Sequence, residues 1–514
     1  MYFEMTENFK NALDKMENTE KNIFITGKAG TGKSTLLKYF RDNTKKSVAV
    51  IAPTGVAAIN IGGQTFHSFF GFLPDVNIES AEETAIAISE KRKKLYRNID
   101  TIIIDEVSML RADLLDCTDI FLRTVCNKKK PFGGKQMVFF GDLYQLPPVV
   151  TSKEKKIFSE IYTSPYFFSA KSFDSLNLEV IELEKIFRQT NEEFVRILNA
   201  IRNNTITEDD INFLNTRLED NVEIKNNDFA VTLTPRNDQA TKINLEMLSQ
   251  LPGKEKIFHG YLFGKFDETN LPTEKKLILK KNAQVMLLNN DTFGRWVNGS
   301  IGKIISFHKD DDIIDVQLIS GETVEVSPFE WDIFEYKYDE NLNCIKSETI
   351  GSFIQYPLKL AWAITIHKSQ GKTFDRMILD IGKGSFSPGQ VYVALSRVRS
   401  IEGLVLKKPL KKNHVFMDWA VVRFMTSYRY KKAREVLPIE ECRAIIEDAI
   451  RNKKRLEIVY LKTSDEKTRR IIRPISAGIL EYAGKPFEGL VAFCEKRGEN
   501  RTFRLDRILE IKEV

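Results

Sequence analysis

The sequence predicts an α/β fold with parallel β-sheet at its core, and three observations support this prediction. Short apolar runs rich in β-branched residues alternate with longer stretches of helical periodicity. A glycine-rich turn follows the first run and opens a helix, as expected where a strand leads into a helix that covers it. Later in the chain the sequence pattern changes to short, closely spaced runs in which apolar and polar residues alternate, as in antiparallel strands. With 514 residues, the chain has room for about three or four domains.

The first part of the chain is expected to form a parallel sheet with helices on its faces. The expected strands are Asn22–Thr26, Ser47–Ala52, Thr101–Ile104 and Gln136–Phe140. Helical stretches such as Ser34–Asp42 and Leu110–Asn127 lie between them. Alternation of strand and helix implies parallel pairing with both faces covered. Two later strands, Ala230–Leu233 and Arg376–Asp380, predict a second lobe of the same kind.

Two β-rich regions complete the predicted organisation. Lys281–Ser352 carries the turn pairs Asn298–Gly299 and Ser320–Gly321 between alternating runs, which indicates a small antiparallel insertion. Pro438 opens a terminal unit, in which a helix is followed by several strands. That helix is expected at Glu440–Asn452, and the strands at Leu456–Leu461, at Arg469–Pro474 and up to Phe503–Leu505.

The composition is that of an ordinary globular protein, with 42% hydrophobic residues, 29% charged residues and a formal net charge of +6. This small positive excess permits a nucleic-acid partner without requiring one. No apolar run approaches the ~18–20 residues of a membrane span, and Met1–Lys10 lacks the features of a signal peptide. The five cysteines are scattered without zinc-binding spacing. We therefore expect a cytoplasmic protein with no membrane partner and with buried or idle thiols.

Residues Gly27–Ser34 fit the pattern G-x-x-x-x-G-K-[ST], directly after a predicted strand and at the start of a predicted helix. Backbone N–H groups of such a loop surround phosphates, and the helix N-terminus adds a favourable dipole. Lys33 would neutralise charge on the β- and γ-phosphates, and the Ser34 hydroxyl would reach magnesium. The loop therefore predicts a nucleoside triphosphate with Mg²⁺ as its ligands.

Adjacent carboxylates after the third predicted strand favour hydrolysis over transfer to another substrate. Asp105 suits magnesium, and Glu106 is suited to polarise an attacking water. A solvated turn is the alternative for this pair. The Gly141–Pro148 loop follows the fourth strand and carries Gln145, a candidate sensor of the γ-phosphate. A purely structural Gly/Pro loop is the alternative there.

A motor ATPase also needs a positive charge from across a cleft to stabilise the transferring phosphoryl group. Arg188 in Leu183–Gln189 and Arg397 in Tyr392–Arg399 are the candidates. Both lie outside the predicted first lobe, as residues acting across a cleft must. For each of them alone, an ordinary surface arginine is the alternative.

Taken together, these segments resemble the Pif-type superfamily 1B DNA helicases over roughly residues 8–403. The family motifs occur in order at Gly27–Thr35, Ala52–Phe72, Ile104–Met109, Gly141–Val149, Leu183–Gln189, Ala363–Thr373 and Tyr392–Val398. Two of these motifs are shared with RecD-like helicases. The signature peculiar to the Pif type is similar to Leu110–Val138, through Asp113, Leu115, Asp116, Arg123 and Pro131–Gly134.

The resemblance implies two RecA-like P-loop lobes with insertions. Residues 1–165 would form lobe 1A, with 73–100 as a 1B element that carries a strand-separating wedge. Lobe 2A would comprise 166–260 and 353–435, interrupted by a β-barrel-like 2B domain at 261–352. Residues 436–514 resemble a WYL domain, which is a small β-barrel.

The resemblance also implies roles for the residues that match family motifs. The catalytic residues would be Lys33, Asp105, Glu106, Gln145, Arg188 and Arg397, with the two arginines as arginine fingers and Ser34 and Asp105 as magnesium ligands. ATP would be bound by Gly27, Lys28, Ala29, Gly30, Thr31, Gly32, Lys33, Ser34, Thr35, Gln370 and Gly371. Related helicases read adenine with a glutamine upstream of the loop, but the first glutamine here is Gln64. Met1–Lys21 would therefore contact the base in another way or not at all.

The implied contacts to single-stranded DNA are Pro53, Thr54, Gly55, His67, Ser68, Phe69, Phe72, Pro148, Thr365, His367, Lys368 and Ser369. Sequence-neutral binding combines phosphate contacts with aromatic or imidazole faces on which bases stack. For Phe66 and Phe70, packing in a core is the alternative. The implied partners are single-stranded and tailed duplex DNA, with G-quadruplex DNA and RNA–DNA hybrids as further candidates, bound by a monomer at a prokaryotic nucleoid.

The WYL resemblance covers Glu440–Ile511, although Glu488–Leu490 replaces the name-giving tripeptide. It implies that arginines bind nucleic acid or a nucleotide-like ligand, and a purely structural cap is the alternative. Three of them, spaced three residues apart, cannot all share one strand face, so some are expected in a turn. The four candidates are Arg473, Arg501, Arg504 and Arg507.

The leading hypothesis is thus an ATP-driven DNA helicase that moves 5′ to 3′ by alternate gripping of the strand by its two lobes. One alternative is a P-loop ATPase that remodels RNA or protein. Another is a nucleic-acid-binding regulator in which the WYL domain senses a ligand and the ATPase acts as a switch.

The segment Lys407–Arg434 holds nine basic residues and one acidic residue, a net charge of +8. Counterion release makes such a segment useful for binding phosphates, and a solvated linker helix is the alternative. We expect that neutralising Lys407, Lys408, Lys411 and Lys412 flattens the salt dependence of DNA affinity, measured by binding titrations at several salt concentrations. An unchanged slope would identify the segment as a linker.

Overall fold

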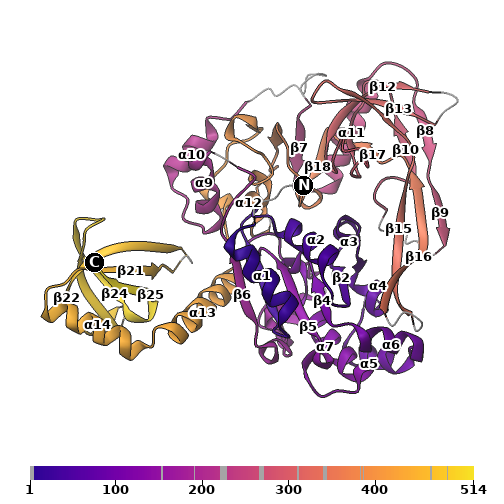
Figure 1. Cartoon of the computed structure of the whole chain (residues 1–514). Coiled ribbons are helices and arrows are strands. Elements are labelled where there is room, and N and C mark those ends of the chain that lie inside the picture. Colours follow the sequence, from indigo (N-terminus) through magenta and orange to yellow (C-terminus); the bar gives the residue numbers. More distant parts are fainter. Residues whose placement is uncertain are drawn as a thin grey trace. The chain divides into compact units, whose positions relative to one another are not determined.

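Figure 1 shows the computed structural model of the chain. It describes residues 5–73, 75–151, 154–189, 191–219, 229–264, 271–308, 312–339, 344–382, 384–385, 387–463, 466–482 and 484–514. Contacts divide the chain into two units, one of residues 1–198 and 207–415, the other of residues 199–206 and 416–514. No helix in the described part of the chain is long and apolar enough to cross a membrane.

The first lobe of the larger unit is built on a six-stranded parallel sheet. The strand order is β3-β2-β4-β5-β1-β6, with β1 at Ile23–Gly27, β2 at Val48–Ala52, β3 at Gln64–Thr65, β4 at Thr101–Ile104, β5 at Gln136–Gly141 and β6 at Glu179–Leu183. The four predicted strands are present. The order also corrects one expectation, because β6 pairs with β1 in this sheet although the expected lobe boundary lies at residue 165.

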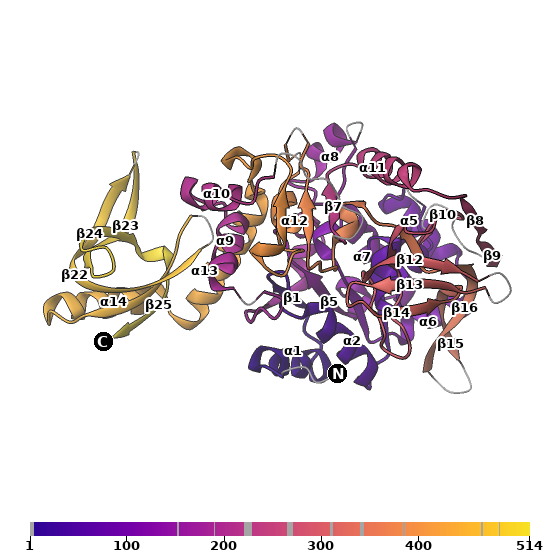
Figure 2. The same cartoon turned by 90° about the horizontal axis from the view of Figure 1, so that it is seen from above.

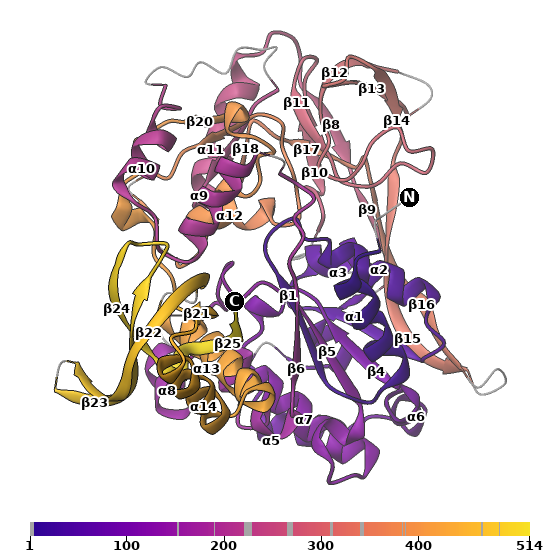
Figure 3. The ribbon, with the colours of Figure 1, turned by 60° about the vertical axis from the view of Figure 1, so that its left-hand side comes forward.

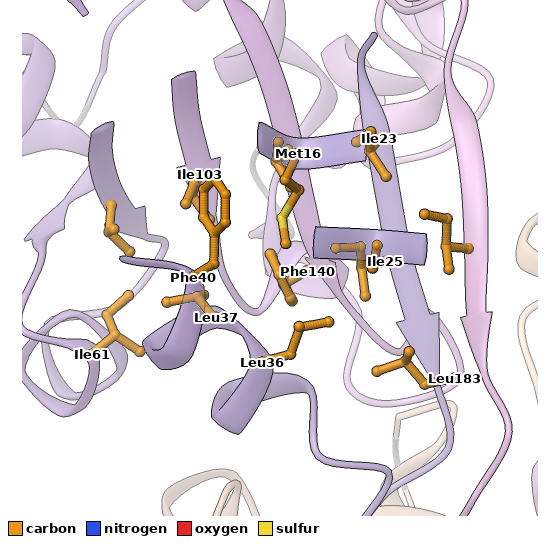
Figure 4. Packing of buried hydrophobic residues seen from close by; sticks show 14 of the residues in the cluster. Met16, Ile23, Ile25, Leu36, Leu37, Phe40, Ile61, Ile103, Phe140 and Leu183 are labelled. Atoms are coloured by element: carbon orange, nitrogen blue, oxygen red, sulfur yellow. The ribbon is translucent and has the colours of Figure 1, made fainter. Parts of the chain in front are cut away.

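Helices cover both faces of this sheet. They are α1 (Glu7–Asn18), α2 (Lys33–Asn43), α3 (Gly55–Ile61), α4 (Phe66–Phe70), α5 (Ile78–Ala87), α6 (Glu90–Asn98), α7 (Ala112–Cys126) and α8 (Lys155–Ile161), with short 3₁₀ turns at Val107–Met109, Pro131–Gly134, Phe167–Ser169 and Phe173–Leu176. Phe9, Ala12 and Met16 recur on one face of α1 and are buried in one cluster with Leu36 and Phe140. Figure 4 shows Met16, Leu36 and Phe140 of this cluster. Residues 73–100, for which a 1B element is predicted, contain the helices α5 and α6.

The second lobe repeats the parallel pattern with four strands. Their order is β18-β7-β19-β20, with β7 at Val231–Thr234, β18 at Ala363–Thr365, β19 at Met377–Leu379 and β20 at Leu404–Leu406. The helices of this region are α9 (Glu192–Arg202), α10 (Glu208–Asn215), α11 (Asn237–Gln250) and α12 (Gln390–Leu395), with 3₁₀ turns at His367–Ser369, Ile401–Gly403 and Lys412–His414.

Between α11 and β18 lies an antiparallel insertion, as the turn pairs predicted, but its strands extend beyond the expected Lys281–Ser352 at both ends. Its strands are β8 (Lys256–His259), β9 (Tyr261–Gly264), β10 (Lys276–Leu279), β11 (Gln284–Leu287), β12 (Ile301–Phe307), β13 (Ile314–Leu318), β14 (Thr323–Val326), β15 (Phe329–Asp339), β16 (Cys344–Gln355) and β17 (Leu358–Leu360). They form sheets ordered β14-β13-β12-β11-β17, β15-β16-β9 and β10-β8. The insertion has its own core, which includes Trp296 and Trp362.

The long hairpin β15–β16 extends from the insertion to the first lobe, where it packs on α6 (Figures 1 and 3). The Tyr336 hydroxyl accepts a hydrogen bond from the Val50 N–H at 3.3 Å, and its ring meets Phe69 edge to face. Arg92 of α6 lies 3.7 Å from the Glu335 carboxylate. The insertion is therefore joined to the second lobe through the chain and contacts the first lobe through this hairpin.

The smaller unit contains α13 (Trp419–Val436), α14 (Ile439–Arg451) and a five-stranded antiparallel sheet ordered β24-β23-β22-β21-β25 (Figure 2). The strands are β21 (Leu456–Leu461), β22 (Lys467–Tyr482), β23 (Lys485–Cys494), β24 (Glu499–Arg504) and β25 (Ile508–Glu513), with a 3₁₀ turn at Leu505–Arg507. Cys442, Ile446 and Ala449 on one face of α14 pack into the core of this sheet.

The segment that resembles the Pif-type signature holds the first lobe together around buried aspartates. Asp116 in α7 is 5% exposed, and its carboxylate accepts hydrogen bonds from the Tyr162 hydroxyl (3.0 Å), the Lys171 N–H (3.1 Å) and the Ser172 N–H (2.8 Å). It ties α7 to the segment that leads into β6. The signature is thus a folding element here.

We expect Asp116→Ala to lower the free energy of unfolding by at least about 2 kcal/mol, because it leaves three donors unpaired, two of them buried. Urea denaturation measures this change. The matched control is Asp174→Ala, whose side chain is exposed and whose effect should stay within about 0.5 kcal/mol. Equal effects of the two substitutions would contradict a structural role for Asp116.

Candidate active site

The glycine-rich loop connects β1 to α2 at the carboxyl edge of the first sheet, as predicted. Gly30 has a φ of 81°, and a Cβ there would lie 2.6 Å from the Arg188 Cβ. The absence of a side chain lets the loop touch the segment after β6, where the Phe187 N–H donates to the Gly30 carbonyl at 2.9 Å. The Lys33 ammonium donates to the carbonyls of Gly27 (2.7 Å) and Lys28 (3.0 Å).

The two carboxylates follow β4, two strands away from the loop in the same sheet. Burial and the charge of Glu106 raise the pKa of Asp105 to about 7. Burial also raises the pKa of Glu106, while Lys33 and Arg397 oppose this shift. The Asp105 carboxylate accepts the Glu106 N–H at 2.9 Å, and Glu106 has a φ of 49°. The pair is therefore desolvated and surrounded by cationic groups, unlike a solvated turn.

A cavity of about 680 Å³ brings the predicted nucleotide residues together, a size typical of ligand sites. Its lining includes Ala29, Gly30, Thr31, Gly32, Lys33, Ser34, Thr35, Glu106, Gln145, Arg188, Gly371 and Arg397. Of the predicted ATP-binding residues, Gly27, Lys28 and Gln370 do not line it. The Gln370 side-chain amide donates to the side-chain oxygen Oε1 of Gln145 at 3.5 Å.

The two candidate arginines reach this cavity from different lobes. Arg397 is 2% exposed, and burial lowers its pKa to about 9. It follows α12 and donates to the Val393 carbonyl (2.9 Å) and the Ser396 hydroxyl (2.7 Å). Arg188 follows β6 of the first sheet, which corrects the expectation that both arginines lie outside the first lobe. Its guanidinium donates to the Ser396 carbonyl at 3.1 Å.

A second cavity, of about 360 Å³, joins the two functional regions. Its lining includes Ser34, Asp105 and Glu106, which are predicted to act on the nucleotide and magnesium. It also includes Thr54, His367 and Lys368, which are predicted to contact DNA. Gln370 and Lys372 also line it. Residues predicted to hydrolyse nucleotide and residues predicted to contact DNA therefore share one space.

Part of the predicted single-strand contact set is accessible. Lys368 and Ser68 are exposed, while Pro53, Thr54, His67 and His367 are half-buried. Burial lowers the pKa of both histidines, with the Arg111 guanidinium contributing at His67. Neutral imidazole rings are compatible with the predicted stacking on bases.

Other members of that set are buried. Phe69 and Phe72 are 1% and 6% exposed within an aromatic cluster that includes Phe70, Tyr96 and Phe121. This corrects the expectation for both rings, because a ring packed on all sides offers no face to a base. Gly55, Pro148, Thr365 and Ser369 are also buried, and the Ser369 hydroxyl donates to the Ile366 carbonyl.

Two residues that the sequence analysis did not select also contact the site. The Tyr392 hydroxyl accepts the Ala29 N–H at 2.9 Å and donates to the Asp142 carboxylate at 3.2 Å. Asp142 stands at the start of the loop that carries Gln145, and Tyr392 lies five residues before Arg397. Their positions inside recognised motifs are the only sequence signal that could have identified them.

In the smaller unit, the candidate arginines are engaged with acidic neighbours. Arg473 pairs with Glu495, Arg501 with Glu499 and Arg504 with Asp506. Arg507 lies in the 3₁₀ turn after β24, which agrees with the expectation that not all of these arginines share a strand. A ligand would have to displace these surface pairs, which are individually weak.

The basic segment Lys407–Arg434 is divided between the two units. Lys407 lies 3.4 Å from the Asp380 carboxylate, and the Lys408 ammonium donates to the Gly382 carbonyl. Lys411 and Lys412 are exposed. That the segment Lys407–Arg434 binds DNA stays a prediction.

Comparison with known proteins supports the resemblance to Pif-type helicases and to a WYL domain. The family model described as PIF1-like helicase matches residues 4–212, and a WYL domain model matches residues 441–513. An ATP-dependent DNA helicase Pif1 of Bdellovibrio bacteriovorus is 33% identical over 414 residues, covering 78% of this chain and 88% of that protein. Pif1 from Bacteroides sp in complex with ADP-AlF4 has a TM-score of 0.76 at 37% identity, covering 84% of this chain and 98% of that one. Bacteroides Pif1 bound to ssDNA has a TM-score of 0.61 at the same identity and coverage.

The position of Glu106 generates a direct test. We expect Glu106→Gln to reduce nucleotide hydrolysis by about 10²–10⁴-fold, because the amide cannot accept a proton, while nucleotide affinity is retained. Steady-state hydrolysis and nucleotide titration measure the two quantities. Glu160→Gln, at an exposed position of α8, is the matched control. Unchanged hydrolysis, or an equal loss of affinity, would contradict the assignment.

Proposed function

The chain belongs to the PIF1-like helicase family, and on this basis we infer that it is an ATP-hydrolysing DNA helicase. The observation that carries the inference is the single cavity in which the glycine-rich loop, Glu106, Gln145 and both arginines meet. Catalysis of phosphoryl transfer is mostly positioning and charge stabilisation, and this set of groups supplies both.

We propose the following division of labour. Loop N–H groups and Lys33 bind the β- and γ-phosphates, Glu106 orients and deprotonates the attacking water, and Gln145 contacts the γ-phosphate. Arg188 and Arg397 neutralise the charge that develops on the transferring phosphoryl group. Because Arg397 comes from the second lobe, hydrolysis requires both lobes to face each other.

Magnesium fits the donors present. The Ser34 hydroxyl and the Asp105 carboxylate line one cavity, and hard oxygen donors of this kind suit Mg²⁺. A divalent cation would favour the ionised form of Asp105, whose pKa burial raises to about 7. When bound, the ion would neutralise phosphate charge.

We propose that the accessible residues Thr54, His67, His367 and Lys368 hold single-stranded DNA next to the nucleotide site. The cavity that joins Thr54, His367 and Lys368 to Asp105 and Glu106 supports this proposal. Opening and closing of the lobes around nucleotide would then move the strand, with 5′-to-3′ polarity implied by the family resemblance. G-quadruplex DNA and RNA–DNA hybrids stay candidate substrates.

The WYL domain would contact nucleic acid through Arg473, Arg501, Arg504 and Arg507 or regulate the motor. We further propose that the helicase acts as a monomer at the nucleoid of a bacterial cell. The similarity to Pif1 of Bdellovibrio bacteriovorus and of Bacteroides supports the bacterial setting alone.

The decisive test uses duplexes with a single-stranded tail at one end. We expect single-stranded DNA to stimulate ATP hydrolysis, and 5′-tailed duplexes to be unwound while 3′-tailed duplexes are not. Lys33→Ala should abolish hydrolysis and unwinding, because the phosphate charge is no longer neutralised, whereas Lys45→Ala at an exposed position should leave both unchanged. Strand-displacement and phosphate-release assays measure these outcomes.

The alternatives give different results. Unwinding of 3′-tailed duplexes alone would show that the protein translocates 3′ to 5′. Stimulation by RNA or protein without unwinding of DNA would identify a remodelling ATPase. Unwinding that persists in Lys33→Ala would contradict the mechanism itself.

A further inference from the structure

Tyr392 in α12 is 3% exposed, and its hydroxyl lies between two elements of the nucleotide site. It accepts the Ala29 N–H of the glycine-rich loop at 2.9 Å and donates to the Asp142 carboxylate at 3.2 Å. Both partners belong to the first lobe, and Tyr392 belongs to the second. One hydroxyl thus satisfies a main-chain donor and a buried acceptor across the junction of the lobes.

The start of α12 is seated directly on the loop after β5. Gly389, which precedes the helix, has a φ of 72°, and a Cβ there would lie 2.4 Å from the Tyr144 carbonyl oxygen and 2.6 Å from that of Gln145. No other residue fits this contact without displacing backbone. Asp142, fully buried in the same loop, accepts the Tyr144 N–H at 3.2 Å.

Residues at the C-terminal end of α12 contact both arginines. Val393 and Ser396 hold the Arg397 guanidinium, and the Ser396 carbonyl accepts the Arg188 guanidinium at 3.1 Å. The Gln189 amide donates to the Ser396 carbonyl at 3.1 Å and to the Val398 carbonyl at 3.2 Å. A helix of six residues therefore links the glycine-rich loop, the Gln145 loop and the two arginines.

We propose that Tyr392 is a positioning residue whose hydroxyl sets the register of α12 on the glycine-rich loop, and so delivers Arg397 and Gln145 together when the lobes close. This inference rests on the proposed function as an ATP-driven motor. The hydroxyl can satisfy Ala29 and Asp142 only while the lobes are in contact, because its two partners and its helix lie on opposite sides of the junction. Parting of the lobes leaves the Asp142 carboxylate without this donor.

The role differs from nucleotide binding. Interactions that strengthen only as the phosphoryl group transfers change kcat, whereas interactions made equally in the ground state change affinity alone. Tyr392 does not line the nucleotide cavity, so its hydroxyl is not expected to contact the nucleotide. Its loss should therefore affect the delivery of Arg397 and Gln145 and not the binding of ATP.

The test is Tyr392→Phe, which keeps the buried ring and removes the hydroxyl. We expect DNA-stimulated kcat to fall about 10- to 100-fold, in line with the loss of a hydrogen bond to a charged group, while KM for ATP changes less than about threefold. Affinity for ADP with aluminium fluoride should fall by a similar factor to kcat. Affinity for ADP and for single-stranded DNA should stay at the wild-type level.

Tyr162→Phe is the matched control, since it removes another buried hydroxyl that donates to a buried aspartate, Asp116, at 3.0 Å. It should lower thermal stability and leave kcat unchanged. Wild-type kcat in Tyr392→Phe, or an equal loss of affinity for ADP and for ADP with aluminium fluoride, would overturn the inference. A wild-type chain without DNA-stimulated hydrolysis would contradict the proposed function, and this inference with it.

Discussion

The larger unit depends on one electrostatic constraint: the charges of the nucleotide site are withdrawn from water and have to balance one another. Burial raises the pKa of Asp105 to about 7 and lowers that of Arg397 to about 9, so each group is costly to ionise alone. Lys33 and Arg397 oppose the pKa shift of Glu106 in turn. Because Arg397 comes from the second lobe, this balance is complete only with both lobes present.

The segment after β18 transmits this arrangement to the insertion. The Lys372 carbonyl lies 3.5 Å from the Arg397 guanidinium, and its ammonium donates to the Asn298 side chain of the insertion at 2.6 Å. Burial lowers the pKa of Lys372 to about 7. One residue thus connects Arg397 to the β-rich insertion, whose hairpin returns to the first lobe through Tyr336 and Glu335. These contacts join the second lobe to the insertion and the insertion to the first lobe.

Residues that mark a family need not perform its chemistry. Asp116 serves the fold, since it pairs the N–H groups of Lys171 and Ser172 ahead of β6. Phe69 packs against Tyr96 and against Tyr336 of the hairpin, so the aromatic cluster contacts the insertion. Among the residues predicted to contact single-stranded DNA, the accessible ones are chiefly polar: Thr54, Lys368, His67 and His367.

The sequence by itself determined whatever depends on neighbours in the chain. The glycine-rich loop, the carboxylates after Thr101–Ile104 and the strand–helix alternation are local patterns, and their chemistry follows from spacing alone. The tertiary structure alone decided what depends on distant segments. Ile23 and Glu179 pair across the sheet although they lie far apart in sequence, which moves Arg188 to the first lobe. The burial of Phe69, and the place of the Tyr392 hydroxyl between Ala29 and Asp142, likewise arise from packing, which no local pattern encodes.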